Sequence, residues 1–140
     1  MLDTNVVVAA LRSGRGASRQ LLRAALEQRF QLLLSVPLLL EYEAVLTRPE
    51  QLAAFRLNAV EVVRLLDALA AVSKPVKLIY RWRPGVADPD DEMVLETALN
   101  GEADAIVSFN TRSFKMTREI FRCPVIPPAA ALQRIRSMKP

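Results

Sequence analysis

Apolar residues repeat at helical spacing in several segments of this chain, and shorter apolar runs separate those segments. Residues 18–29 and 58–72 each carry a one-sided apolar face and predict amphipathic helices. Ser35 followed by Pro37 predicts the start of another helix, because a serine cap with proline in the first turn suits a helix N-terminus. The apolar face of that helix runs through Leu38, Leu39, Tyr42, Val45 and Leu46.

The short apolar runs predict buried strands. These runs cover residues 30–34, 105–109 and 124–126. The β-branched residues 6–8 predict a short opening strand, and residues 74–80 alternate weakly, as in a strand or an extended connector. Because Met1 leaves almost no room before Asp3, either the true start lies upstream or the sheet accepts a very short first strand.

The second half of the chain carries clearer helix boundaries. Asp88 followed by Pro89 predicts an N-cap with proline in the first turn, and this helix is expected to end near Asn100. Gly101 is expected to terminate it in the left-handed conformation. A last helix is predicted from residue 127 onward, with cations suited to its C-terminal end. These cations are Arg134, Arg136 and Lys139.

Strands that alternate with helices favour right-handed crossovers and a parallel sheet covered on both faces. The predicted fold class is therefore α/β, a three-layer α/β/α domain with a central, mostly parallel sheet. With 140 residues, 51% of them hydrophobic, the chain is long enough for one well-buried core and too short for two. Residues 1–140 are expected to form a single domain.

Composition indicates where such a protein works. The longest apolar stretches are well below the ~18 residues of a membrane span, no signal-peptide pattern opens the chain, and Cys123 has no disulfide partner. We therefore expect a soluble, cytoplasmic protein without membrane contact. The net charge of +4 favours phosphate-rich partners such as nucleic acid, although a solvated arginine-rich surface explains the same charge.

The chain contains no histidine, so its chemistry must rest on acidic side chains. Triads that need a histidine base are excluded, and any metal site must use oxygen ligands, which suit Mg²⁺ or Mn²⁺. In open parallel sheets, sites form beyond the carboxyl ends of the strands. Asp3 and Asn110 each follow a predicted strand, whereas Asp104 precedes one and is expected to have a loop or capping role.

Helix phase separates some of the remaining acids. Asp91 falls within about 10° of the centre of the apolar face of its helix, and Asp90 lies about 110° away. A carboxylate aimed at the sheet costs energy unless it is paired or holds a metal, so Asp91 is the candidate, with compensation of the helix dipole as the alternative. Glu41 and Glu43 lie on opposite flanks of their helix at equal angles, and phase does not separate them.

Four motifs occur in order along essentially the whole chain. They are Leu2-Asp3-Thr4-Asn5-Val6, a glutamate six residues after Ser35, Asp88-Pro89-Asp90-Asp91, and Ala103-Asp104-Ala105-Ile106-Val107-Ser108-Phe109-Asn110. Each is weak alone, but their order and spacing together resemble the PIN-domain family. More narrowly, they resemble its branch of VapC-like toxins from toxin–antitoxin pairs.

The resemblance implies a metal-dependent ribonuclease whose acidic pocket binds Mg²⁺ or Mn²⁺ and hydrolyses RNA phosphodiester bonds. By position, Asp3, Glu41 and Asp91 match the family's acids, and the offset from Ser35 favours Glu41 over Glu43. A cognate antitoxin is the implied protein partner, and a homodimer is one expected form.

The resemblance also assigns supporting roles. Asn110 stands where the family often has a fourth aspartate, so it is a candidate with weaker metal affinity. Ser108, together with Thr4 or Asn5, is expected to orient ligands or water. Apart from the resemblance, the hydrolysis of a phosphodiester calls for cations beside the flanking phosphates, and Arg12 and Arg112 are candidates for that role.

Two readings from other classes remain open. An aspartate after a strand is also how aspartyl-phosphate phosphohydrolases begin, but those enzymes usually carry a second aspartate two residues on, where this chain has Asn5. A Mg²⁺-dependent enzyme acting on a small phosphoester is therefore one alternative. The other is a binding domain that keeps the fold with little activity, which Asn110 makes plausible.

Overall fold

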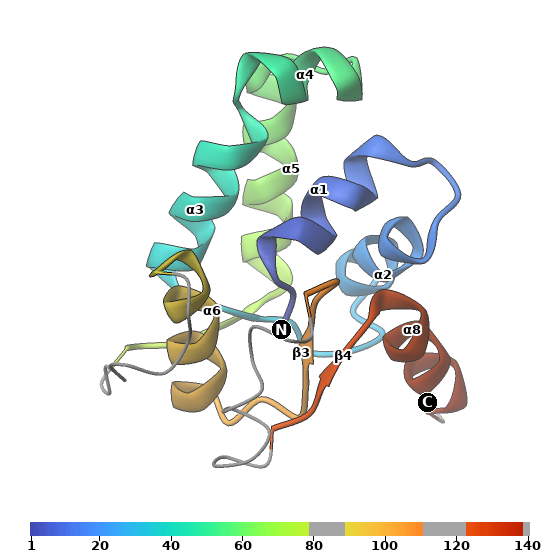
Figure 1. Ribbon diagram of the computed structural model, residues 1–140, viewed down its shortest axis with the longest axis vertical. Helices are drawn as coiled ribbons and strands as arrows, with labels where there is room; N and C mark the ends of the chain where they lie inside the picture. Colours follow the sequence, from blue (N-terminus) through green and yellow to red (C-terminus); the bar gives the residue numbers. More distant parts are fainter. Residues whose placement is uncertain (79–88, 111–122, 139–140) are drawn as a thin grey trace.

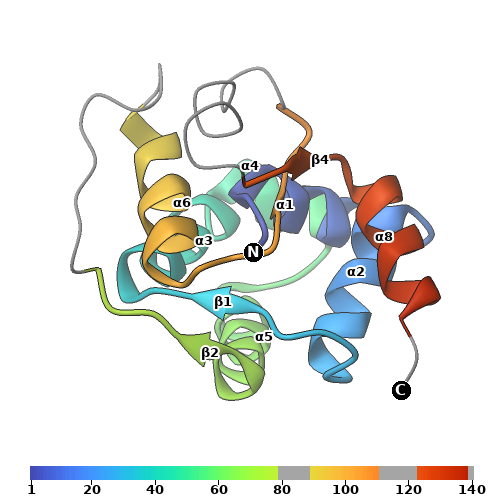
Figure 2. The same cartoon turned by 90° about the horizontal axis from the view of Figure 1, so that it is seen from below.

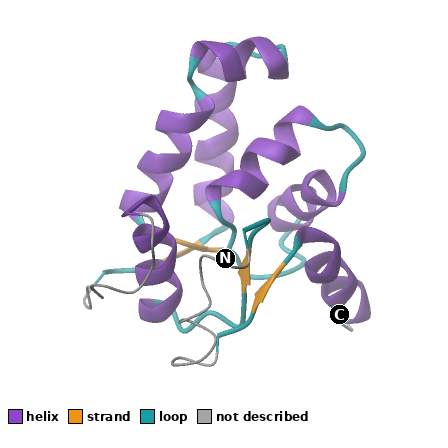
Figure 3. Cartoon of the chain, viewed as in Figure 1, coloured by secondary structure: helices purple, strands orange, loops and turns teal. Residues whose placement is uncertain are grey.

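The computed structural model describes residues 1–78, 89–110 and 123–138, and for residues 89–93 it describes the backbone alone. Most of these residues are helical (Figure 3). The helices are α1 (Thr4–Arg12), α2 (Ala17–Leu26), α3 (Val36–Leu46), α4 (Pro49–Phe55), α5 (Ala59–Val72), α6 (Pro89–Asn100) and α8 (Pro128–Ser137). The strands are β1 (Leu33–Leu34), β2 (Lys74–Pro75), β3 (Ile106–Val107) and β4 (Val125–Ile126).

The strands pair in parallel and are very short. β1 pairs with β2, and β3 pairs with β4. The chain start adds one more parallel bridge, in which Leu2 lies beside Val107. The backbone N–H of Asp3 donates to the Val107 carbonyl at 2.9 Å, and the Val107 N–H donates to the Met1 carbonyl at 2.9 Å. The first strand is therefore a stub that ends directly at Asp3.

Helices surround these strands in the predicted three-layer α/β/α arrangement. In Figure 1, α6 stands beside α3 at one side of the molecule, and α2 lies beside α8 at the other; both pairs are in contact. Figure 2 shows the same arrangement from below, with β1 and β2 side by side, α6 on one side of this pair and α5 on the other. No helix in the described part of the chain is long and apolar enough to cross a membrane.

Most predicted elements are confirmed, with shorter strands than expected. Ser35 caps α3 by accepting a hydrogen bond from the Leu38 N–H at 3.3 Å. α5 opens with a capping box formed by Asn58 and Glu61, and α2 ends at Leu26, three residues early. Helix α4 was not anticipated. The predicted cap Asp88, residues 79–80, Arg112 and Lys139 lie outside the described residues.

The predicted opening strand at residues 6–8 is wrong, because these valines belong to α1. Their β-branched side chains favour strands only weakly, and tertiary packing overrides that preference. Val6 and Val7 fall on the same face as Ala10 and Leu11, and all four are buried. The strand position is taken instead by Met1 and Leu2, which places Asp3 at the junction of strand and helix.

The expected left-handed conformation of Gly101 is also wrong, since no described glycine has a positive φ and the left-handed residue is Glu102, with φ 52°. A glycine is needed at position 101 for another reason. A Cβ there would lie 2.8 Å from Leu33 Cδ1 and 2.9 Å from Val76 Cγ2. The missing side chain therefore lets the end of α6 approach β1 and the residue after β2.

Candidate active site

Asp3 occupies the carboxyl end of the first strand and is also the N-cap of α1. Its side chain is only 5% exposed. Oδ1 accepts a hydrogen bond from the Thr4 N–H at 2.7 Å, and Oδ2 accepts one from the Ser108 hydroxyl at 2.6 Å. A buried carboxylate is costly unless it is hydrogen-bonded, and here two donors and the positive end of the α1 dipole offset that cost.

Ser108 holds this carboxylate from the neighbouring strand. Its hydroxyl donates to Asp3 and accepts from the Asn110 N–H at 3.0 Å and from Asn5 Nδ2 at 3.3 Å. A hydroxyl offers one donor and two acceptor positions, so all of its hydrogen-bonding capacity is used. Ser108, which is fully buried, therefore orients Asp3 rather than an external ligand.

Asn5 closes the same network from the first turn of α1. Besides its bond to Ser108, its Oδ1 accepts a hydrogen bond from the Phe109 N–H at 3.4 Å. The amide thus joins α1 to the loop after β3, so of the two residues expected to orient groups here it is Asn5 that has the structural contacts. Thr4 contributes its backbone N–H to Asp3.

Helix α3 meets this edge of the sheet through Tyr42. The fully buried Tyr42 hydroxyl donates to the carbonyl of Leu2, the residue before Asp3. Burial, and to a smaller extent the negative charge of Asp3, raise the pKa of this hydroxyl well above its ordinary value. It therefore remains a protonated donor at all physiological pH values. This bond places α3 beside the backbone that leads into Asp3.

Glu41 and Asp91 are brought to the same level by the packing of α3 on α6. Figure 1 shows the two helices side by side and running in opposite directions. The buried hydroxyls of Ser35 and Thr97 lie 2.6 Å apart and join them. Glu41 is six residues after Ser35 and Asp91 six residues before Thr97, so both backbone positions lie ~9 Å along the helix axes from that bond.

The structure describes the side chains of Glu41 and Glu43, but only the backbone of Asp90 and Asp91. Glu41 and Glu43 are both half-buried, so exposure does not separate them. The side chains of Asp90 and Asp91 lie outside the described residues, and the predicted phase of Asp91 stays a prediction. Burial does not test that phase, because every residue from 94 to 98 is buried, including Glu96 and Thr97, whereas Leu99 of the predicted face is only half-buried.

Asn110 and Asp104 lie at opposite ends of β3. The Asn110 N–H bonds to Ser108, and the residue itself is exposed at the same edge as Asp3. Asp104 is exposed on the loop before β3, as expected for a residue outside the site. Arg12 donates from Nε to Gln51 Oε1 at 2.9 Å, so α4 already engages this candidate for binding phosphate.

The donor set fits a hard divalent cation, because the candidate ligands are carboxylate and amide oxygens. Among the side chains that the structure describes, no three acidic or cysteine groups converge on one point. Asp3 and Glu41 are the described members of the predicted ligand set, and the predicted third member, Asp91, stands at the start of α6.

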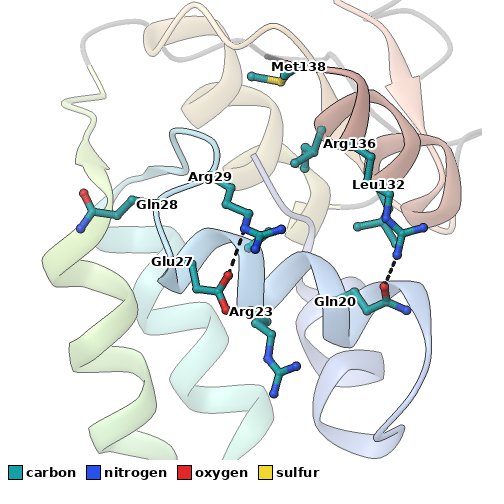
Figure 4. Close-up of a pocket in the computed structure, with 10 residues that line it drawn as sticks. Gln20, Arg23, Glu27, Gln28, Arg29, Leu132, Arg136 and Met138 are labelled. Atoms are coloured by element: carbon teal, nitrogen blue, oxygen red, sulfur yellow. Dashed lines mark hydrogen bonds and ion pairs between the residues drawn. The ribbon is translucent and has the colours of Figure 1, made fainter. Parts of the chain in front are cut away.

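A second polar region lies between α2 and α8, away from Asp3. This groove has a volume of about 830 Å³ and is lined by Arg23, Arg29 and Arg136 together with apolar side chains such as Leu132 and Met138 (Figure 4). Arg29 pairs with Glu27 at 3.0 Å, and Arg136 donates to Gln20. Arg23 and Arg136 stand in the last turns of their helices, where cations offset the helix dipole. No predicted site residue lines the groove.

A family profile described as a PIN domain matches residues 1–112. The chain therefore belongs to the PIN-domain family. Proteins of this family are in general nucleases that use divalent metal ions and act on nucleic acid. Comparison with the curated proteins and with the solved structures finds no match.

Three contacts at this edge were not predicted from the sequence. Tyr42 was read only as part of an apolar face, although a tyrosine in a buried face needs a partner for its hydroxyl. Asp3 was read as a candidate ligand and not as a helix cap, although Asp followed by Thr and Asn before an apolar run is a usual N-terminal signal. The bond from Ser108 to Asp3 joins residues 105 positions apart and has no local signal.

Proposed function

We propose that this protein is a ribonuclease that hydrolyses RNA phosphodiester bonds with Mg²⁺ or Mn²⁺. The observation that carries the proposal is the buried carboxylate of Asp3 at the carboxyl edge of the sheet. Hydrogen bonds from Thr4 and Ser108 hold it there, and Tyr42 of the helix that carries Glu41 bonds to the residue before it. Such an immobilised anion at a ligand-binding edge suits the recognition of a cation.

Asp3, Glu41 and Asp91 are the proposed metal ligands, and Asn110 is a neutral member of the site. Three clustered carboxylates repel one another, so a site of this kind favours a divalent cation over an empty state. When bound, the cation supplies charge neutralisation at the scissile phosphate and lowers the pKa of the attacking water. The chain contributes the fixed orientation of Asp3, through Ser108 and Asn5.

RNA is the proposed substrate, and the net charge of +4 favours its approach. The proposed biological role is that of a VapC-like toxin whose antitoxin covers the acidic edge, with a cation of the antitoxin substituting for the metal. A cytoplasmic location, one domain over residues 1–140 and a homodimer belong to the same proposal.

The small-molecule phosphohydrolase reading has weaker support. Such enzymes place a second aspartate where this chain has Asn5, and both ends of the Asn5 amide are engaged with Ser108 and Phe109. Asn5 is therefore built into the support of Asp3. Hydrolysis of p-nitrophenyl phosphate in preference to single-stranded RNA would nevertheless favour that reading.

The decisive experiment measures cleavage of single-stranded RNA with and without divalent metal. Purified protein should cleave with Mg²⁺ or Mn²⁺ and stop in EDTA, because no histidine base is present to replace the metal chemistry. Undiminished cleavage in excess chelator would contradict the proposal.

Asp3→Asn is the matched control, prepared in parallel to expose any contaminating ribonuclease. It should lower activity by more than about a hundredfold, beyond the effect typical of residues that merely support a metal ligand. Its stability in metal-free buffer should change by no more than about 1 kcal/mol, because relief of charge repulsion offsets a weaker cap. Wild-type cleavage by this variant would remove Asp3 from the site.

A further inference from the structure

Tyr42 makes the one hydrogen bond, among the described residues, that joins the backbone before Asp3 to the helix carrying Glu41. Its hydroxyl donates to the Leu2 carbonyl, and the side chain is fully buried. No backbone N–H of the described residues donates to that carbonyl. The bond is therefore the means by which this buried acceptor is satisfied.

The bond is placed so that it controls a distance between two acids. Leu2 immediately precedes Asp3, and Tyr42 immediately follows Glu41, so each end of the bond is adjacent in sequence to a proposed ligand. Asp3 cannot move independently of Leu2, because its own N–H bonds to Val107 and its carboxylate to Ser108. The remaining freedom is the position of α3 relative to that fixed edge.

Charge repulsion between Asp3 and Glu41 acts on the position of α3 relative to this edge. Two carboxylates that share a cation repel each other whenever the cation is absent, which favours movement of α3 away from Asp3. Leu38 and Leu46 keep α3 packed in the core, and the Tyr42 hydroxyl adds a contact that is restricted in both distance and angle.

We propose that Tyr42 is a positioning residue that holds α3 at the separation from Asp3 at which Glu41 and Asp3 bind the same divalent cation. This inference rests on the proposed metal-dependent function and adds a residue that touches neither metal nor RNA.

The test is calorimetric titration of Mn²⁺ into the full chain carrying Tyr42→Phe, which removes the hydroxyl and keeps the ring. Metal affinity should fall about tenfold, the lower end of the effect typical of groups that orient metal ligands. Leu132→Ala on α8 is the control for lost packing: it should lower the melting temperature and leave Mn²⁺ affinity unchanged. Wild-type affinity in Tyr42→Phe would overturn the inference.

A second measurement separates positioning from general destabilisation. In a Glu41→Gln background, Tyr42→Phe should weaken Mn²⁺ binding little further, because the distance that it controls no longer matters. Full additivity of the two effects would overturn the inference. In cleavage assays, Tyr42→Phe should need about tenfold more Mn²⁺ for half-maximal rate with an unchanged KM for RNA.

Asp3→Asn separates the failure of this inference from the failure of the proposed function. If Asp3→Asn loses Mn²⁺ binding and Tyr42→Phe retains it, the positioning role is wrong and the metal site stands. If both variants bind Mn²⁺ as the wild type does, the metal site itself is wrong. Should Tyr42→Phe not fold, the Tyr42 hydroxyl proton of the unaltered protein can be followed by NMR during Mg²⁺ titration. It should shift along the binding curve, and a constant signal would overturn the inference.

Discussion

The edge of the sheet around Asp3 and the groove between α2 and α8 are both polar, but they are built in opposite ways. At the edge, a carboxylate that is 5% exposed is held by donors from two elements. In the groove, charged side chains such as Arg29 and Glu27 are 67% and 46% exposed. Their ion pair is screened by water and contributes little to stability.

This contrast shows which charges require an explanation beyond solubility. An exposed arginine near a helix C-terminus has an inexpensive structural role. Burying the Asp3 carboxylate costs desolvation free energy, which its hydrogen bonds must offset. The Ser108 hydroxyl, whose donor and acceptor positions are all used, orients that carboxylate. Substitutions at the edge should therefore affect metal binding, whereas substitutions in the groove should affect little.

The largest effect is expected at the start of α6. Asp91→Asn should abolish cleavage and weaken Mn²⁺ binding by more than about tenfold, because it removes a proposed charged ligand. Asp90→Asn is the matched control on the neighbouring residue and should change neither by more than about twofold. Calorimetry and RNA cleavage measure both variants. The reverse result would mean that the predicted helix phase is off by one residue.

Ser108→Ala should produce the next largest effect. It leaves Asp3 Oδ2 without its donor and the Asn110 N–H without its acceptor, which should cost about 1–3 kcal/mol of stability. Mn²⁺ affinity should fall about tenfold as Asp3 loses its orientation.

Ser73→Ala is the control for Ser108→Ala, because the Ser73 hydroxyl bonds locally to the Leu69 carbonyl, at 2.6 Å. Chemical denaturation and Mn²⁺ titration of both variants separate the two cases. Equal metal affinities in them would mean that Ser108 is only structural.

Asn110→Asp should have the opposite effect and raise the metal affinity of the edge around Asp3. An added carboxylate should tighten Mn²⁺ binding by about tenfold, roughly 1.4 kcal/mol, and raise cleavage at low metal concentration. Calorimetry against the unaltered protein measures the gain. Unchanged affinity would place the Asn110 side chain outside the site, although its N–H supports Ser108.

The smallest effect is expected from the groove. Arg136→Ala should change stability by no more than about 0.5 kcal/mol and RNA cleavage by no more than about twofold. Arg23→Ala is the parallel variant from the facing helix. A tenfold loss of cleavage in both, recovered at low salt, would instead assign the groove to RNA binding and would weaken the contrast drawn above.

Local signals determined much of this fold. The caps at Ser35 and Asn58 and the apolar faces of α3 and α5 depend on neighbours within one or two turns, so the sequence alone located these helices. The position of Asn110 after a strand also followed from local pattern combined with the general rule for parallel sheets. The strand predicted at residues 6–8 was wrong because the strand propensity of valine is weak. Met1 and Leu2 occupy the strand position instead.

Only the tertiary structure decided how the acidic edge is supported. Ser108 and Asp3 are 105 residues apart, Tyr42 and Leu2 are 40 apart, and Ser35 and Thr97 are 62 apart. No local pattern specifies such partners, because each bond depends on where the packed core places two distant backbones. The sequence by itself determined which acids are available and on which elements they stand. Packing decided which hydroxyl groups hold those elements together, since a buried donor bonds to whatever acceptor the fold brings within reach.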